Sequence, residues 1–98
     1  MKNLGIDIGG SFIKIGIVEN DKLIHNIEIS NKNQNVEDFV TNLNPNLIEL
    51  IRKFEPLSIG IGFPGSIDED GNIISAPNMT YWVNKNILDI FRGLTELP

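Results

Sequence analysis

The sequence predicts an α/β fold with one mixed sheet, in the element order βββαβ. Two runs rich in Ile and Val, 3–9 and 12–18, flank a pair of glycines, as in a β-hairpin. From 36 to 54 the apolar residues recur at steps of three and four, which is typical of one face of a helix. A short apolar run at 57–62 follows, and a strand placed after a helix tends to lie parallel to the first strand.

The strand connections are predicted from turn residues. Gly9-Gly10 is expected to supply the positive φ angles of a tight hairpin. Asn20-Asp21 marks the next turn, and the apolar residues between Leu23 and Ile29 indicate a third strand beside the second. The sheet should therefore open with three antiparallel strands.

The predicted helix has recognisable end signals. Asn35 precedes it as an N-cap, and Arg52-Lys53 suit the negative end of its dipole. Pro45 lies in its middle, and because proline lacks a backbone donor we expect a kink or a restart there.

The last third of the chain is rich in loops. We expect a small hairpin through Asp70-Gly71 and a short helix over 86–93 that begins near Asn84 and ends at Gly93. Trp82 precedes this helix and is expected to fill the core.

Composition limits the classes of function. Of the 98 residues, 41% are hydrophobic and 21% charged, as in an ordinary globular protein. The net charge is −5 and the eight Lys and Arg residues are scattered, so we expect neither a nucleic acid nor a membrane as a partner. The chain has no cysteine and shows no hydrophobic signal segment, which favours a cytoplasmic protein.

Asp7 is a charged residue at the end of an apolar strand, directly before the glycines. One interpretation makes its carboxylate an acceptor for the hairpin's own amides. The other uses Asp7, Gly9, Gly10 and Ser11 together. The glycines let backbone N–H groups approach a phosphate, the Ser11 hydroxyl adds a donor, and Asp7 holds a hydrated Mg²⁺ that the phosphates also bind. The residues alone leave both interpretations open.

A second glycine cluster, GIGFPG at 60–65, has the spacing of the dinucleotide-binding motif. In that motif a helix begins among the glycines, whereas here Pro64-Gly65-Ser66 leads into DEDG, which is turn composition. We therefore expect this cluster to serve another purpose.

Two stretches together resemble a known family. DIGGS, after the first strand, looks like the phosphate loop of the superfamily of sugar kinases, heat-shock ATPases and actin, whose ribonuclease H-like core opens with the same βββαβ order. IGIGFPGSIDEDGNIISAPNMTYW resembles the sugar-contacting stretch of the ROK family of sugar kinases, which includes glucokinases, and of related repressors. Ser11 stands where the family usually has Thr and keeps the hydroxyl.

The resemblance implies an activity and its ligands. The protein would phosphorylate a hydroxyl of a hexose or amino sugar, with ATP and Mg²⁺ bound at Asp7, Gly9, Gly10 and Ser11. Gly65 and Ser66 would present backbone groups to the sugar, and Asn78 would hydrogen-bond a sugar hydroxyl. For Asn78 the residues leave a second interpretation, which is a simple turn residue.

The resemblance also implies parts that lie outside the sequence. Residues 1–98 would be the N-terminal domain of such a kinase, cut before its next strand. The general-base Asp, a zinc motif and a second domain that holds the nucleotide are expected beyond Pro98, so this stretch alone should be inactive.

The alternative is a sugar-sensing repressor or a sugar-binding module of the same family. Such repressors carry a helix-turn-helix domain ahead of the phosphate loop, whereas here the loop begins within seven residues of Met1, which favours the kinase. The identity of the sugar and the formation of a homo-oligomer stay open.

Overall fold

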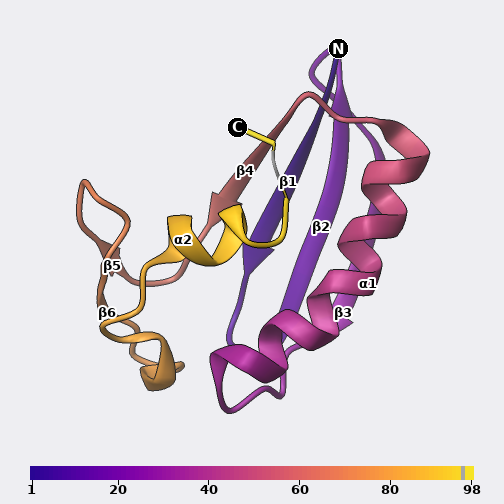
Figure 1. Ribbon diagram of the computed structural model, residues 1–98. Helices are drawn as coiled ribbons and strands as arrows, with labels where there is room; N and C mark the ends of the chain where they lie inside the picture. The colour runs from indigo at the N-terminus through magenta and orange to yellow at the C-terminus, as the bar shows by residue number, and fades with distance from the viewer. Residues whose placement is uncertain (96) are drawn as a thin grey trace.

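A four-stranded sheet with two helices on one of its faces forms the body of the protein (Figure 1). The structure is a computed structural model, and it describes residues 1–95 and 97–98. The strands lie in the order β3-β2-β1-β4, and their bounds are β1 (Lys2–Ile8), β2 (Phe12–Glu19), β3 (Lys22–Ser30) and β4 (Ser58–Gly62). β2 is antiparallel to both neighbours, whereas β4 is parallel to β1. The predicted mixed βββαβ sheet is confirmed.

The two turns that join the first three strands are built differently. Asn20 and Asp21 have φ angles of 52° and 66°, as a type I′ turn requires. Gly9 and Gly10 have no positive φ, so that part of the prediction is wrong. Gly9 is needed for space instead, because a Cβ atom there would lie 2.8 Å from the carbonyl oxygen of Phe12. The Gly9 amide donates a hydrogen bond to that same oxygen, at 2.9 Å.

The helix α1 (Val36–Phe54) lies across the sheet, with its apolar side inward (Figure 1). Asn35 caps it as predicted, since its side-chain oxygen accepts from the Asp38 amide at 2.8 Å. The core between helix and sheet consists of alternate strand residues and one helical stripe, namely Leu4, Ile6, Ile8, Ile13, Ile15, Ile17, Phe39, Leu43, Leu47 and Leu50.

Pro45 lies inside α1 without ending it, so the predicted restart is wrong. Proline removes only the bond that the carbonyl group of Thr41 would accept. Thr41 is exposed, so water can take the place of that donor.

Among the described residues, neither helix combines the length and the apolar character that a membrane-spanning helix needs.

The chain after β4 forms a hairpin, a 3₁₀ turn and a short helix. The hairpin strands are β5 (Ser66–Ile67) and β6 (Ile73–Ser75), and Gly71 has the positive φ of 89° that their turn needs. The 3₁₀ turn η1 (Thr80–Trp82) precedes α2 (Ile87–Arg92). Asn86 caps α2 and Gly93 ends it, so the predicted start near Asn84 is two residues early. Asn84 itself is left-handed, with φ of 69°.

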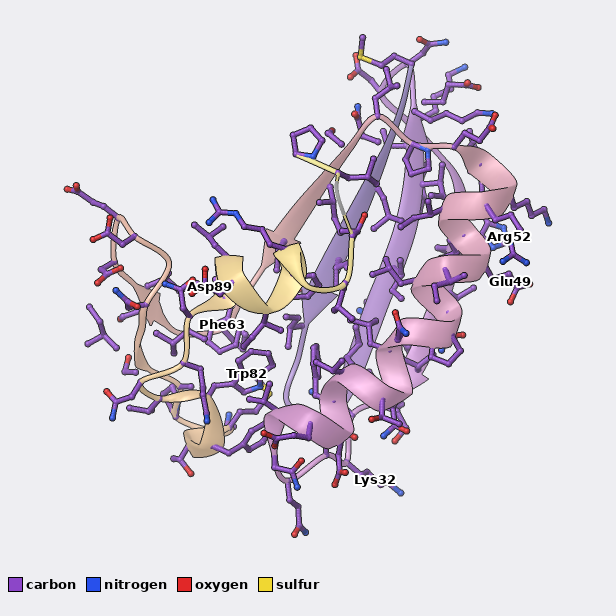
Figure 2. The ribbon with its side chains drawn as sticks, in the orientation of Figure 1. Lys32, Glu49, Arg52, Phe63, Trp82 and Asp89 are labelled. Atoms are coloured by element: carbon purple, nitrogen blue, oxygen red, sulfur yellow. The ribbon has the colours of Figure 1, made fainter. Side chains whose placement is uncertain are left out.

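Trp82 connects this excursion to the core, as predicted. Its side chain is fully buried and meets the Phe39 ring of α1 edge to face, with centroids 4.8 Å apart. The ring of Phe63 also meets Trp82 edge to face, with centroids 5.4 Å apart, and Figure 2 shows both side chains below α2. The segment after β4 is therefore held to α1 by aromatic contacts.

Leu43→Ala tests the assigned inner face of α1. The side chain is fully buried between helix and sheet, so its loss should lower the free energy of unfolding by about 2–5 kcal/mol. Ile48→Ala, on the exposed side of the same helix, should change it by about 0.5 kcal/mol or less. Urea denaturation followed by Trp82 fluorescence measures both values. Equal losses would contradict the assignment.

Candidate functional site

The loop between β1 and β2 presents free backbone donors to solvent. Gly10 and Ser11 are exposed. Among the hydrogen bonds of the described residues, neither of their amides donates to another part of the chain. Adjacent free amides on a glycine loop can bind an anion. The loop therefore has the donors that the sequence predicts for a phosphate.

Asp7 lies on the face of the sheet that α1 leaves open. Successive strand residues point to opposite faces, so the burial of Ile6 and Ile8 under the helix sends Asp7 the other way. Within the described residues its carboxylate accepts no hydrogen bond and joins no ion pair. The interpretation of Asp7 as an acceptor for the hairpin amides is therefore wrong.

A shallow groove of about 660 Å³ runs over this open face. Asp7 lies opposite Lys14 on β2, and Lys14 lies opposite Glu28 on β3, so three alternating charges line the groove. On its other side Asp7 is the register partner of Gly62, where a Cβ atom would lie 3.4 Å from a carboxylate oxygen. The carboxylate thus has room and is accessible to solvent.

The donor set at Asp7 fits a hydrated magnesium ion better than a caged metal. In the part of the chain that the structure describes, no three His, Cys, Asp or Glu side chains gather around a common point. Mg²⁺ keeps several waters and is often held by one or two carboxylates plus phosphates. One exposed carboxylate beside a loop of free amides matches that pattern.

Gly65 and Ser66 lie at the base of the β5–β6 hairpin. Ser66 pairs with Ser75, and a Cβ atom on Gly65 would overlap the Ser75 carbonyl oxygen, so only glycine fits there. The chain runs directly from β4 to β5 between 62 and 66, and no helix begins in the 60–65 cluster. The dinucleotide motif therefore lacks its helix, in agreement with the sequence analysis.

Asn78 lies against the phosphate loop. A Cβ atom placed on Gly10 would be 3.6 Å from the Cβ atom of Asn78, which is an ordinary van der Waals contact. Asn78 is exposed, and its side chain makes none of the hydrogen bonds found among the described residues. An asparagine that merely stabilises a turn would bond to the nearby backbone. The structure therefore does not support the turn interpretation, and the ligand interpretation stays a prediction.

The sequence analysis missed Asn31, which lies behind the β1–β2 loop and bonds to it. It is 5% exposed, and its amide donates to the Gly9 carbonyl oxygen at 2.6 Å. The only local signal was the recurrence of asparagine at 31, 33 and 35, which reads as loop composition.

Two side chains near the site have shifted pKa values. Asp68 accepts bonds from the backbone and side chain of Asn72 and from the Asp70 amide, which lower its pKa. Burial raises the pKa of Tyr81. The Asp68 carboxylate thus stabilises the hairpin turn, and both of its oxygens are already hydrogen-bonded there.

Comparison with known proteins decides the family. The model of the ROK family matches residues 3–98. The chain belongs to the ROK family. A glucokinase from Thermotoga maritima is 30% identical over 92 residues, which cover 91% of this chain and 29% of that protein.

Solved ROK structures share the fold. A ROK family glucokinase from Streptomyces griseus, in complex with glucose and AMPPNP, matches with a TM-score of 0.85 and 22% sequence identity. The match covers 100% of this chain and 31% of the glucokinase. A ROK family transcriptional regulator, a homologue of the E. coli MLC protein, matches with a TM-score of 0.83 and 19% sequence identity. The match covers 99% of this chain and 26% of the regulator. The fold is thus the ribonuclease H-like, actin-like ATPase one. The chain spans less than a third of each of these relatives.

Gly9→Ala and Gly10→Ala test which of the two glycines in this loop is required for packing. At position 9 the new methyl group would clash with Phe12, so the free energy of unfolding should fall by about 1–3 kcal/mol. At position 10 the methyl group makes an ordinary contact, and stability should change by about 0.5 kcal/mol or less. Thermal and urea unfolding of both variants test this. A larger loss for Gly10→Ala would reverse the assignment.

Proposed function

We propose that this chain supplies the phosphate loop and part of the sugar site of an ATP-dependent kinase for a hexose or an amino sugar. The observation that carries the proposal is the proximity of Asn78 to Gly10. It places a loop with free amides beside an uncommitted side-chain amide. A phosphoryl group and a sugar hydroxyl held by these two loops would lie next to each other, as direct transfer requires.

On the phosphate side, each residue has a separate task. The amides of Gly10 and Ser11 would bind phosphate oxygens, and the Ser11 hydroxyl would add a donor. Asp7 would hold Mg²⁺ through water, and the ion would supply positive charge against the phosphates. Membership of the ROK family, which includes glucokinases, supports this assignment.

On the sugar side, short polar groups would read the hydroxyl positions. The Asn78 amide offers both donors and an acceptor, which a sugar hydroxyl can use in either direction. Gly65 and Ser66 would offer backbone groups from the adjacent hairpin. The general base, the second domain and a zinc motif are proposed to lie beyond residue 98, and a cytoplasmic location stays a prediction.

A sugar-sensing regulator of the same family is the second candidate. The similarity of the fold to a ROK transcriptional regulator supports it. The two candidates differ in phosphoryl transfer. An assay of ADP release by the full-length protein, with ATP, Mg²⁺ and a panel of hexoses and amino sugars, should show turnover for a kinase. Calorimetric binding of a sugar without any ADP release would favour the regulator.

Asp7→Ala should abolish phosphoryl transfer in the full-length protein and leave sugar affinity within about twofold, because Asp7 is assigned to Mg²⁺ and phosphates alone. Glu49→Ala is the matched control, since it removes an exposed acid from α1, far from the loop (Figure 2). Kinetic assays and calorimetry with the sugar measure the two effects. A comparable loss of sugar affinity would contradict this division of roles.

Asn78→Ala should weaken sugar binding by about 1–3 kcal/mol, because a sugar hydroxyl would lose its partner. Thr80→Ala, an exposed neighbour, is the control and should bind the sugar like the unaltered protein. Titration calorimetry gives both affinities. An unchanged affinity for Asn78→Ala would make Asn78 a simple surface residue.

A further inference from the structure

Aromatic residues aside, Asn31 is the one buried residue with a polar side chain in the part of the chain that the structure describes. It follows β3 directly and lies at the inner side of the phosphate loop. Its neighbour Lys32 extends outward at the lower end of α1 (Figure 2). A buried amide is costly unless all of its groups are bonded, so its partners indicate what it does.

Every hydrogen-bonding group of the Asn31 side chain has a partner. Its Nδ2 donates to the Gly9 carbonyl oxygen at 2.6 Å and to the Met79 sulfur at 3.4 Å. Its Oδ1 accepts from the Asn33 amide at 2.8 Å. The Asn31 backbone amide also donates to the Ser11 carbonyl oxygen at 2.8 Å. Asn31 thus bonds to both ends of the phosphate loop, Gly9 and Ser11, and to Met79, which follows Asn78.

The bond to Gly9 determines the direction of a free donor. A peptide unit is planar and trans, so its C=O and N–H groups point in opposite directions. The Gly9 carbonyl group points inward to Asn31, and the Gly10 amide of the same peptide unit therefore points outward. Without the Asn31 side chain this peptide could rotate, and the outward donor would be lost for part of the time.

A second asparagine anchors the arrangement to α1. Asn33 donates to Asn31 and accepts from the Nδ2 of Asn42, which is the seventh residue of α1. The position of Asn31 is therefore fixed from the helix side, and the two loops are fixed relative to it.

We propose that Asn31 is a positioning residue that couples the two loops. It aims the Gly10 amide outward and ties the phosphate loop to Met79, so that a ligand on one loop favours the ligand-ready arrangement of the other. The coupling between ligands rests on the proposed function. The aiming of the loop does not, because it follows from contacts within the chain.

Hydrogen exchange in the ligand-free, full-length protein tests the positioning. Asn31→Ala should speed the exchange of the hydrogen-bonded amides in these two loops, namely those of Gly9 and Met79, by about tenfold, the scale of one or two lost hydrogen bonds. Asn31→Asp keeps the shape but replaces the donor by an acceptor, and should do the same if Asn31→Ala fails to fold. Asn46→Ala is the control, because its amide bonds only within α1. Faster exchange confined to 30–33 would overturn the proposal.

Calorimetry tests the coupling. In the unaltered protein, AMPPNP should bind more tightly when the sugar is present, and the sugar more tightly with AMPPNP, by the same factor. Asn31→Asp should reduce that factor to about one and leave the affinity for the sugar alone within about twofold. Met79→Leu removes only the sulfur contact and should reduce the factor without faster exchange in 8–12.

The outcomes separate this inference from the proposed function. If the unaltered protein binds neither ligand, the proposed function fails, and hydrogen exchange still decides the role of Asn31. If both ligands bind with coupling that Asn31→Asp leaves unchanged, the proposed function stands and the coupling role of Asn31 fails.

Discussion

The parallel pairing of β1 with β4 determines where the loops of the candidate site lie. Its register sets Asp7 beside Gly62, so both strands leave the sheet at the same end. The carboxyl ends of parallel strands share one edge of a sheet, which brings the loops that follow them together. The phosphate loop and the hairpin with Gly65 and Ser66 therefore start as neighbours, although 55 residues separate Asp7 from Gly62 along the chain. Without this pairing the two glycine clusters would be unrelated.

The aromatic core then fixes the excursion that follows β4. Trp82 meets the ring of Phe39 in α1 and that of Phe63 just after β4, and the ring centroid of Phe91 in α2 lies 6.5 Å from that of Phe39. The arrangement has a cost. Among the described residues, neither the Trp82 indole N–H nor the Tyr81 hydroxyl finds a hydrogen-bond partner, although both atoms are buried. The burial of these large rings stabilises the excursion against that cost, and this keeps Asn78 near Gly10.

The candidate site has opposite requirements on the two faces of the sheet. Under α1, β-branched and leucine side chains fill the space, whereas the open face carries Gly5, Gly16 and Gly60 in register. A Cβ atom at Gly5 or Gly60 would meet nothing within 4 Å, so packing within the described chain does not demand glycine at these two positions, whereas at Gly16 it would lie 2.8 Å from Cδ1 of Leu23. They keep the groove beside Asp7 wide. The alternation of the strands thus lets one set of residues build the core and the other keep the carboxylate accessible.

The sequence by itself determined the strands, the inner face of α1, the burial of Trp82 and the family motifs, because periodicity and turn chemistry depend on near neighbours. It predicted the residues of the candidate site, but their functional roles stay predictions. Only the tertiary structure decided that Gly9 serves close packing rather than positive φ, that α1 continues through Pro45, and that Asp7 accepts no hairpin amide. The role of Asn31 was equally hidden, since its bond to Gly9 spans 22 residues. Contacts between distant segments depend on how the sheet and core assemble, and no local pattern carries that information.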